Sequence, residues 1–288
     1  MPELRKIATK DGLTFDAWVE GPESGEIVLL LHGFPQSRHT WRAQVPVLAA
    51  AGYRVIAPDQ RGYSPGARPD PKNLDNYNYS HLVWDGLNIV EACGGGDRRF
   101  HLVGHDWGGQ VSWGLGAWFG AERLASLSIL SRPHPTAFAL ALQAPDNDQK
   151  ERSRHHRAFL NPDTARLLTE DGARRLRRSL SEAGVPADAI ELYVSVIGPP
   201  EAMEAALAWY RAQRDLRIDL RSPITVPTLY VWGDADNSVS HMAAEGTAAC
   251  VSGAYRFVVL PGIGHFSTDQ VPDRINELLL EHIGANPA

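Results

Sequence analysis

The stretch from Phe100 to Gly109 constrains the fold more than any other part of the sequence. An apolar run rich in strand-forming residues stops at Gly104, and beyond Asp106 small residues open an apolar segment, 111–119, that predicts a buried helix. A strand that turns into a helix within so few residues bends sharply, so the apex residue is strained and small residues must flank it. We therefore expect a strand, a tight turn with Asp106 at its apex, and a helix. For this string alone, an ordinary turn in which Asp106 caps the helix remains the alternative.

Apolar runs alternate with helical patterns along most of the chain. We expect a hairpin formed by 6–8 and 13–19, further strands at 26–31, 53–58, 100–103, 124–130, 228–232 and 255–260, and helices at 40–51, 80–93, 111–119 and 272–283. Strands that alternate with helices pair in parallel through βαβ crossovers. The predicted fold class is therefore α/β, with a mostly parallel central sheet and helices on both faces.

The segment 133–222 interrupts this alternation, because it contains several helical patterns and many arginines but no strand-like run. Helices inserted between two strands would form a lid over the C-terminal ends of the strands, where such sheets bind ligands. We expect its arginines to form a solvated face. The expected organisation is a core in two parts, 1–132 and 223–288, with a helical lid at 133–222.

Composition excludes several classes of protein. The chain has 288 residues, 43% of them hydrophobic, and a net charge of −6, which allows a large core and disfavours a nucleic-acid binder. It shows neither a secretory signal nor an apolar stretch that could span a bilayer. Cys93 and Cys250 lack metal-ligand spacing, so two reduced thiols are expected. We expect a cytoplasmic protein without metal, cofactor, nucleic-acid or membrane partner, and a homodimer is left open.

The loop after the first buried strand, His32-Gly33-Phe34-Pro35, suits an oxyanion hole. Acyl chemistry at Asp106 needs two aligned N–H groups that point at the developing oxyanion. We expect the main-chain N–H groups of Trp107 and Phe34 to supply them, with Gly33 allowing a close backbone approach and Pro35 fixing the turn.

An acid and a base follow two late strands. Asp236 and Asp234 both lie in the loop after 228–232, and Asp236 has the more usual Gly-x-x-Asp spacing. His265 follows the last strand, so it can face Asp106 and be oriented by the acid. The other histidines weighed for this role are expected to be structural (His101, His105) or exposed (His241, His282).

Together these segments resemble the α/β-hydrolase superfamily over essentially the whole chain, and within it the epoxide hydrolase branch. Gly104-x-Asp106-x-Gly108 looks like the superfamily's nucleophile elbow, with Asp where Ser is usual. The stretches that carry the resemblance are HGFPQS at 32–37, DQRGYS at 59–64, GHDWGG at 104–109 and WYR at 209–211. The resemblance implies that Tyr210 is a lid acid. It places a second lid tyrosine near 153–156, where this chain has none and His155 stands at about the matching position.

The resemblance implies hydrolysis of a small-molecule epoxide by water to a vicinal diol, through an ester on Asp106 that His265 and water then cleave. An aspartate can attack a strained sp³ carbon, whereas serine would suit esters or amides. Two alternatives stay open. A haloalkane dehalogenase would use the same nucleophile, and the indole N–H of Trp107 would be one of the two side-chain donors that a halide needs, but Phe34 offers no second one. Haloacetate dehalogenases would need arginines just after the nucleophile, where this chain has Trp107 and Gln110. The other alternative is a catalytically silent protein that binds a small molecule.

Overall fold

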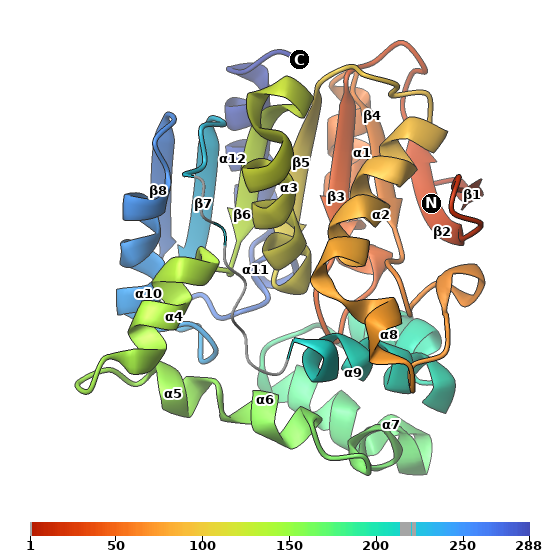
Figure 1. The fold of residues 1–288 in the computed structure, drawn as a ribbon, viewed down its shortest axis with the longest axis vertical. Coiled ribbons are helices and arrows are strands. Elements are labelled where there is room, and N and C mark those ends of the chain that lie inside the picture. Colours follow the sequence, from red (N-terminus) through yellow and green to blue (C-terminus); the bar gives the residue numbers. More distant parts are fainter. Residues whose placement is uncertain (1, 214–219, 221–222) are drawn as a thin grey trace.

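An eight-stranded sheet forms the centre of the molecule, in the strand order β1-β2-β4-β3-β5-β6-β7-β8 (Figure 1). The structure is a computed structural model that describes residues 2–213, 220 and 223–288. The strands are β1 (Leu4–Ala8), β2 (Thr14–Glu20), β3 (Ile27–Leu31), β4 (Arg54–Pro58), β5 (Phe100–His105), β6 (Leu124–Leu130), β7 (Thr228–Gly233) and β8 (Tyr255–Leu260). The expected hairpin, β1 with β2, is antiparallel, β2 is antiparallel to β4, and all the other pairs are parallel. The predicted fold class is confirmed.

The two faces of the sheet are covered by separate hydrophobic cores. All five residues of β3 are buried, and successive side chains point to opposite faces: Leu29 and Leu31 belong to one core, Val28 and Leu30 to the other. Helices α2 and α3 lie in front of the sheet and α1 and α12 behind it (Figure 1). The helices flanking the sheet are α1 (Gln44–Ala50), α2 (Tyr79–Ala92), α3 (Trp107–Arg123), α10 (His241–Gly246), α11 (Ser267–Gln270) and α12 (Pro272–Gly284).

The helix expected at 40–51 is divided in two. A short 3-10 helix spans Arg38–Trp41, and α1 begins only at Gln44. Pro46 gives the physical reason, because it has no N–H and is tolerated only in the first turn of a helix. The other expected elements begin and end within a few residues of the predicted bounds.

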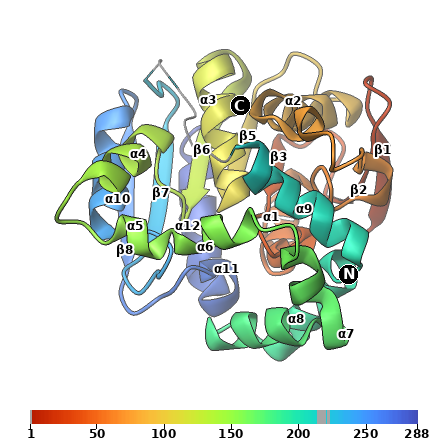
Figure 2. The same ribbon diagram turned by 60° about the horizontal axis from the view of Figure 1, so that its bottom comes forward.

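Along the described chain, six helices follow β6 and precede β7, and we call them the inserted helices. They are α4 (Pro135–Gln143), α5 (Gln149–Arg152), α6 (Arg154–Phe159), α7 (Thr164–Glu182), α8 (Ala187–Ile197) and α9 (Pro200–Ala212). With the bottom of the molecule turned forward, they lie across the carboxyl ends of the strands (Figure 2). Of the predicted lid segment, 214–219 and 221–222 lie outside the described residues, and so does its expected boundary at 222.

One surface assignment is wrong. His282 is only 8% exposed, and its Nε2 lies 3.2 Å from the carbonyl oxygen of Pro227. It follows Ile275 and Leu278 at helical spacing and therefore shares the buried face of α12. His241 is exposed, as expected.

Two further expectations concern metals and membranes. Cys93 and Cys250 are free, and the part of the chain that the structure describes brings together no group of three His, Cys, Asp or Glu side chains that could hold a metal ion. In the same ranges, no helix combines the length and apolarity needed to cross a bilayer.

Candidate active site

Asp106 stands at the apex of the turn between β5 and α3. Its φ of 49° and ψ of −117° are strained for a residue with a side chain. The flanking glycines permit the bend: a Cβ on Gly108 would lie 2.0 Å from the carbonyl oxygen of Leu31, and one on Gly104 would lie 2.4 Å from Oγ of Ser112. The strand, tight turn and helix expected from the sequence are therefore present, with the aspartate held at the carboxyl edge of the sheet.

The two carboxylate oxygens of Asp106 have different partners. The main-chain N–H of Phe34 donates to Oδ1 at 2.9 Å, and Nε2 of His265 lies 3.4 Å from Oδ2. Gly33 allows the loop to come this close, because a Cβ there would lie 2.4 Å from Cβ of Asp106. Trp107 is the first residue of α3, so its N–H has no acceptor within the helix. Both N–H groups expected for an oxyanion hole thus belong to backbone next to Asp106.

His265 joins two buried carboxylates. Its Nδ1 donates to Oδ2 of Asp236 at 2.8 Å, while its Nε2 faces Asp106. Asp236 is fully buried and also accepts the N–H groups of Ser238 and Val239. Asp234, the alternative acid, is exposed and accepts instead from the N–H of Gly262 at 2.6 Å. The spacing argument and the geometry therefore favour the same aspartate.

The charges of this group of three stabilise one another. Burial opposes ionisation of Asp106, but the hydrogen bond and charge of His265 outweigh it and hold the pKa of Asp106 well below its usual value. Burial would likewise lower the pKa of His265, but Asp236 and Asp106 raise it to about 10. His105, whose Nε2 donates to the carbonyl oxygen of His265 at 2.8 Å, has its pKa lowered to about 4 by burial. The free site therefore holds an imidazolium between two carboxylates, oriented from behind by a neutral histidine.

This arrangement predicts a pH-dependent contribution to stability. The pKa of His265 is raised to about 10 in the folded chain, against about 6.5 for an unperturbed histidine. A raised pKa stabilises the fold fully below about pH 6.5, and that stabilisation is lost as the pH rises toward 10. We expect the Tm advantage of the wild type over His265→Gln to be greatest near pH 6 and to shrink by pH 10, as measured by circular dichroism. An advantage that stays constant or grows with pH would contradict the paired imidazolium.

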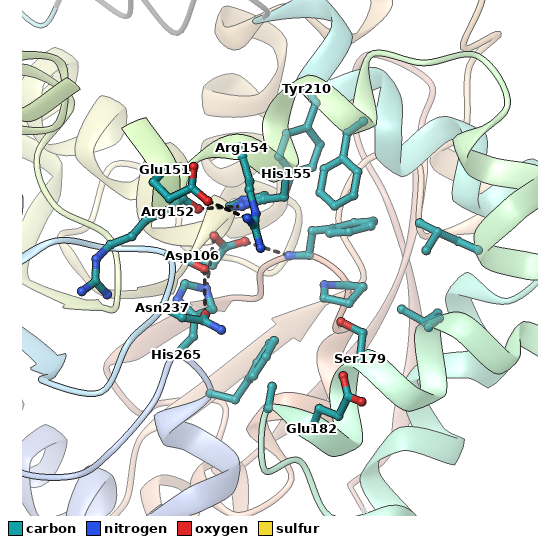
Figure 3. Close-up of a pocket in the computed structure, with 18 of the residues that line it drawn as sticks. Asp106, Glu151, Arg152, Arg154, His155, Ser179, Glu182, Tyr210, Asn237 and His265 are labelled. Atoms are coloured by element: carbon teal, nitrogen blue, oxygen red, sulfur yellow. Dashed lines mark hydrogen bonds and ion pairs between the residues drawn. The ribbon is translucent and has the colours of Figure 1, made fainter. Parts of the chain in front are cut away.

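A cavity of about 760 Å³ opens in front of Asp106 and His265. Its opposite side comes from the inserted helices, with Tyr210 on α9 and His155 on α6 (Figure 3). Tyr210 is 4% exposed, and its ring packs edge-on against that of Trp107, with centroids 5.0 Å apart. Asp106, Tyr210 and His155, which are far apart in the sequence, therefore line one cavity.

His155 has a defined tautomer. Its Nδ1 lies 3.0 Å from the carbonyl oxygen of Arg152, which can only accept, so Nδ1 carries the proton. Burial lowers the pKa of His155. In its neutral form the side chain therefore has a lone pair on Nε2, and only the imidazolium can donate from that atom.

Arg132 is a charged residue near the site that was not predicted from the sequence. Arg132 follows β6, is 7% exposed, and donates from Nε to Oε1 of Gln110 at 2.7 Å. Its guanidinium carbon lies 5.7 Å from the centre of the Trp107 ring and 4.7 Å from that of Phe138. Its position directly after a predicted parallel strand, at the same sheet edge as Asp106, was the available signal.

Comparison with known proteins identifies the family of the chain. The family model described as alpha/beta hydrolase fold matches residues 26–270. AB hydrolase superfamily protein YfhM of Bacillus subtilis is 32% identical, over 96% of this chain and 97% of that protein. Epoxide hydrolase A of Mycobacterium tuberculosis is 31% identical, over 96% of each. The crystal structure of epoxide hydrolase A from Mycobacterium thermoresistibile superposes with a TM-score of 0.83 at 27% identity, covering 100% of this chain and 99% of the other. The chain belongs to the α/β-hydrolase superfamily, in the branch that includes the epoxide hydrolases.

Proposed function

We propose that the protein hydrolyses an epoxide to a vicinal diol through a covalent ester on Asp106. The observation that carries the proposal is the pair of environments around the Asp106 carboxylate, with a backbone N–H at Oδ1 and His265 at Oδ2. The names of the relatives support the same reaction. The inserted helices act as the lid in this proposal, since they close the cavity opposite the nucleophile.

Ring opening uses the ionised carboxylate as the nucleophile. Oδ1 of Asp106 is held by the N–H of Phe34, so Oδ2 attacks the ring carbon and the C–O bond on its far side breaks. The ring oxygen becomes an alkoxide and takes the phenolic proton of Tyr210, which faces the cavity from α9. The product of this step is a hydroxyalkyl ester of Asp106.

Ester hydrolysis needs a neutral His265. Esterification removes the charge of Asp106, which is one of the groups that raise the pKa of His265. The imidazole then loses its proton to water, and a proton from water restores the phenol of Tyr210. It accepts a proton from water, and the hydroxide attacks the ester carbonyl carbon while the N–H groups of Phe34 and Trp107 hold the oxyanion. The departing diol oxygen takes the proton back from His265. Asp106 is released as the carboxylic acid and gives its proton to His265, which restores the imidazolium between the two carboxylates.

The second lid donor in this proposal is His155, and its tautomer restricts the role. Since Nδ1–H is bonded to the carbonyl of Arg152, Nε2 donates to the ring oxygen only from the imidazolium. Burial disfavours that form. Tyr210 is therefore the principal acid, and His155 assists at lower pH.

The contacts favour this reaction over the two alternatives. A halide would need two side-chain donors, and the Phe34 side chain offers none beside the oxyanion loop. A silent binding protein would have no need of the linked Asp106, His265 and Asp236.

Isotope labelling tests the covalent route. In a single turnover in heavy-oxygen water, we expect an unlabelled first diol and one solvent oxygen incorporated into Asp106, measured by mass spectrometry of the product and the peptide. Asp106 supplies the oxygen that bonds to the substrate, and water attacks the carboxyl carbon. Solvent label that appears directly in the first diol would refute the ester, and an unreacted panel of aryl and alkyl oxiranes would refute the activity.

A further inference from the structure

Arg132 is a buried cation that the reaction described above does not use. Its Nε donates to a neutral acceptor, the Gln110 side chain. Within 2–213, 220 and 223–288, no carboxylate lies at ion-pair distance from the guanidinium. Burying a charge without a partner is costly. The charge of Arg132 must therefore be stabilised by negative charges that lie farther away than an ion pair.

Burial lowers the pKa of Arg132, and among the groups that oppose this shift the charge of Asp106 is the strongest. The imidazolium of His265 balances only one of the two carboxylates it joins, so the site carries one uncompensated negative charge. Arg132 is the nearby cation that lies over the ring of Trp107, the residue after Asp106. Gly109 makes room for this placement, because a Cβ there would lie 2.9 Å from Cβ of Arg132.

Ring opening moves negative charge from Asp106 toward the ring oxygen beside Tyr210. The ring of Trp107 lies between Arg132 and the proton donor. It packs against the ring of Tyr210, and the guanidinium of Arg132 lies over it. Burial raises the pKa of Tyr210 far above its usual value, while the hydrogen bond from Trp107 and the charge of Arg132 lower it. The charge of Arg132 therefore acts on Asp106, where the negative charge starts, and on Tyr210, beside which it ends.

We propose that Arg132 is a positioning residue whose buried charge stabilises negative charge on Asp106 before attack and on the ring oxygen and Tyr210 during ring opening. It acts through its field and through Trp107 and does not touch the substrate. The inference rests on the proposed function, because it assigns Arg132 a part in that ring opening.

Three substitutions separate the charge of Arg132 from its packing. Arg132→Met removes the charge and keeps an apolar side chain between Trp107 and Phe138. Gln110→Glu keeps the guanidinium and cancels its charge with a carboxylate at the acceptor position. Arg132→Lys keeps the charge and loses the planar stacking. Thermal melting of each variant checks folding.

The rate of ester formation, measured by rapid quench and intact mass, is the first readout. We expect Arg132→Met and Gln110→Glu each to slow it roughly 10- to 100-fold, since a buried charge acts strongly in a low-dielectric site. We expect Arg132→Lys to stay within about threefold of the wild type, because a field depends on charge and not on shape. Losses in both Arg132 variants with a normal Gln110→Glu would show a packing role and overturn the proposal.

Titration of His155 by NMR is a second readout that needs no substrate. Its imidazole faces Asp106, His265, His156 and Arg132, and a His155→Gln spectrum assigns the signal. We expect its pKa to rise in Arg132→Met and Gln110→Glu and to stay near the wild-type value in Arg132→Lys. A His155 pKa that is the same in the wild type and in all the variants would overturn the proposed effect of the Arg132 charge. A titration that follows them, in a protein that opens no epoxide, would support the field and refute the proposed function instead.

Discussion

Replacing Asp106 with alanine is expected to lower epoxide hydrolysis by at least about 10⁴-fold, because the reaction loses the only group that bonds to the substrate. The substitution leaves the cavity, Tyr210 and the Phe34 N–H in place, so substrate should still bind. Product formation from aryl and alkyl oxiranes and from haloalkanes measures the effect in the same assay. Intact mass should show no adduct on the variant at any time.

Asp234→Ala is the matched control for this loss. Asp234 lies at the same edge of the sheet but is exposed, and its carboxylate accepts the N–H of Gly262. Its activity should therefore stay close to that of the wild type. Hydrolysis that persists in Asp106→Ala would mean that water attacks the epoxide directly. Turnover of haloalkanes in the wild type, lost with Asp106, would assign the nucleophile to dehalogenation instead.

The sheet could be predicted from sequence because its strands are apolar on both faces and each is followed by a helical pattern. The run at 26–31 gave β3 almost to the residue. The chemistry of the sheet edge followed from the same reasoning, since residues directly after parallel strands meet at one edge. Asp106, His265 and Asp236 each follow such a strand, and the structure brings the three together.

Positions set by packing were harder to predict. The spacing of Ile275, Leu278 and His282 implies a shared helix face, yet the polarity of histidine suggested solvent exposure, and His282 is buried. Arg132 was overlooked for a related reason. A cation is expected at the surface, and nothing in the local sequence shows that Gln110 supplies its acceptor.

The inserted helices were the least predictable part. Their order along the chain does not determine which faces close over the sheet, because helix packing depends on side chains from several segments. Tyr210 and His155 were placed near the site by resemblance alone, and the structure adds that both line the cavity with Asp106. The tautomer of His155 depends on a backbone carbonyl one turn earlier, and no sequence pattern reports such a contact.

Replacing His265 with glutamine is expected to trap the ester. Glutamine cannot accept a proton from water, so the second step should slow by about 10² to 10⁴-fold. The first step retains its requirements, since the N–H of Phe34 still holds Oδ1 of Asp106 and Tyr210 still donates. Intact mass spectrometry should therefore show the protein gaining the mass of one epoxide, and peptide mapping should place the addition on Asp106.

His241→Gln is the matched control, because His241 is exposed at the start of α10 and lies outside the cavity. It should turn over normally and accumulate no ester. The comparison separates the two steps, because loss of the base affects only the attack of water.

If His265→Gln hydrolysed epoxides at the wild-type rate, His265 would not be the base. If it lost turnover without accumulating any adduct, the imidazolium would be needed to keep Asp106 ionised, and the slow step would be ring opening. A stable adduct on Asp106 that forms in His265→Gln and never in His241→Gln is the outcome that follows from an imidazole placed between Asp106 and Asp236.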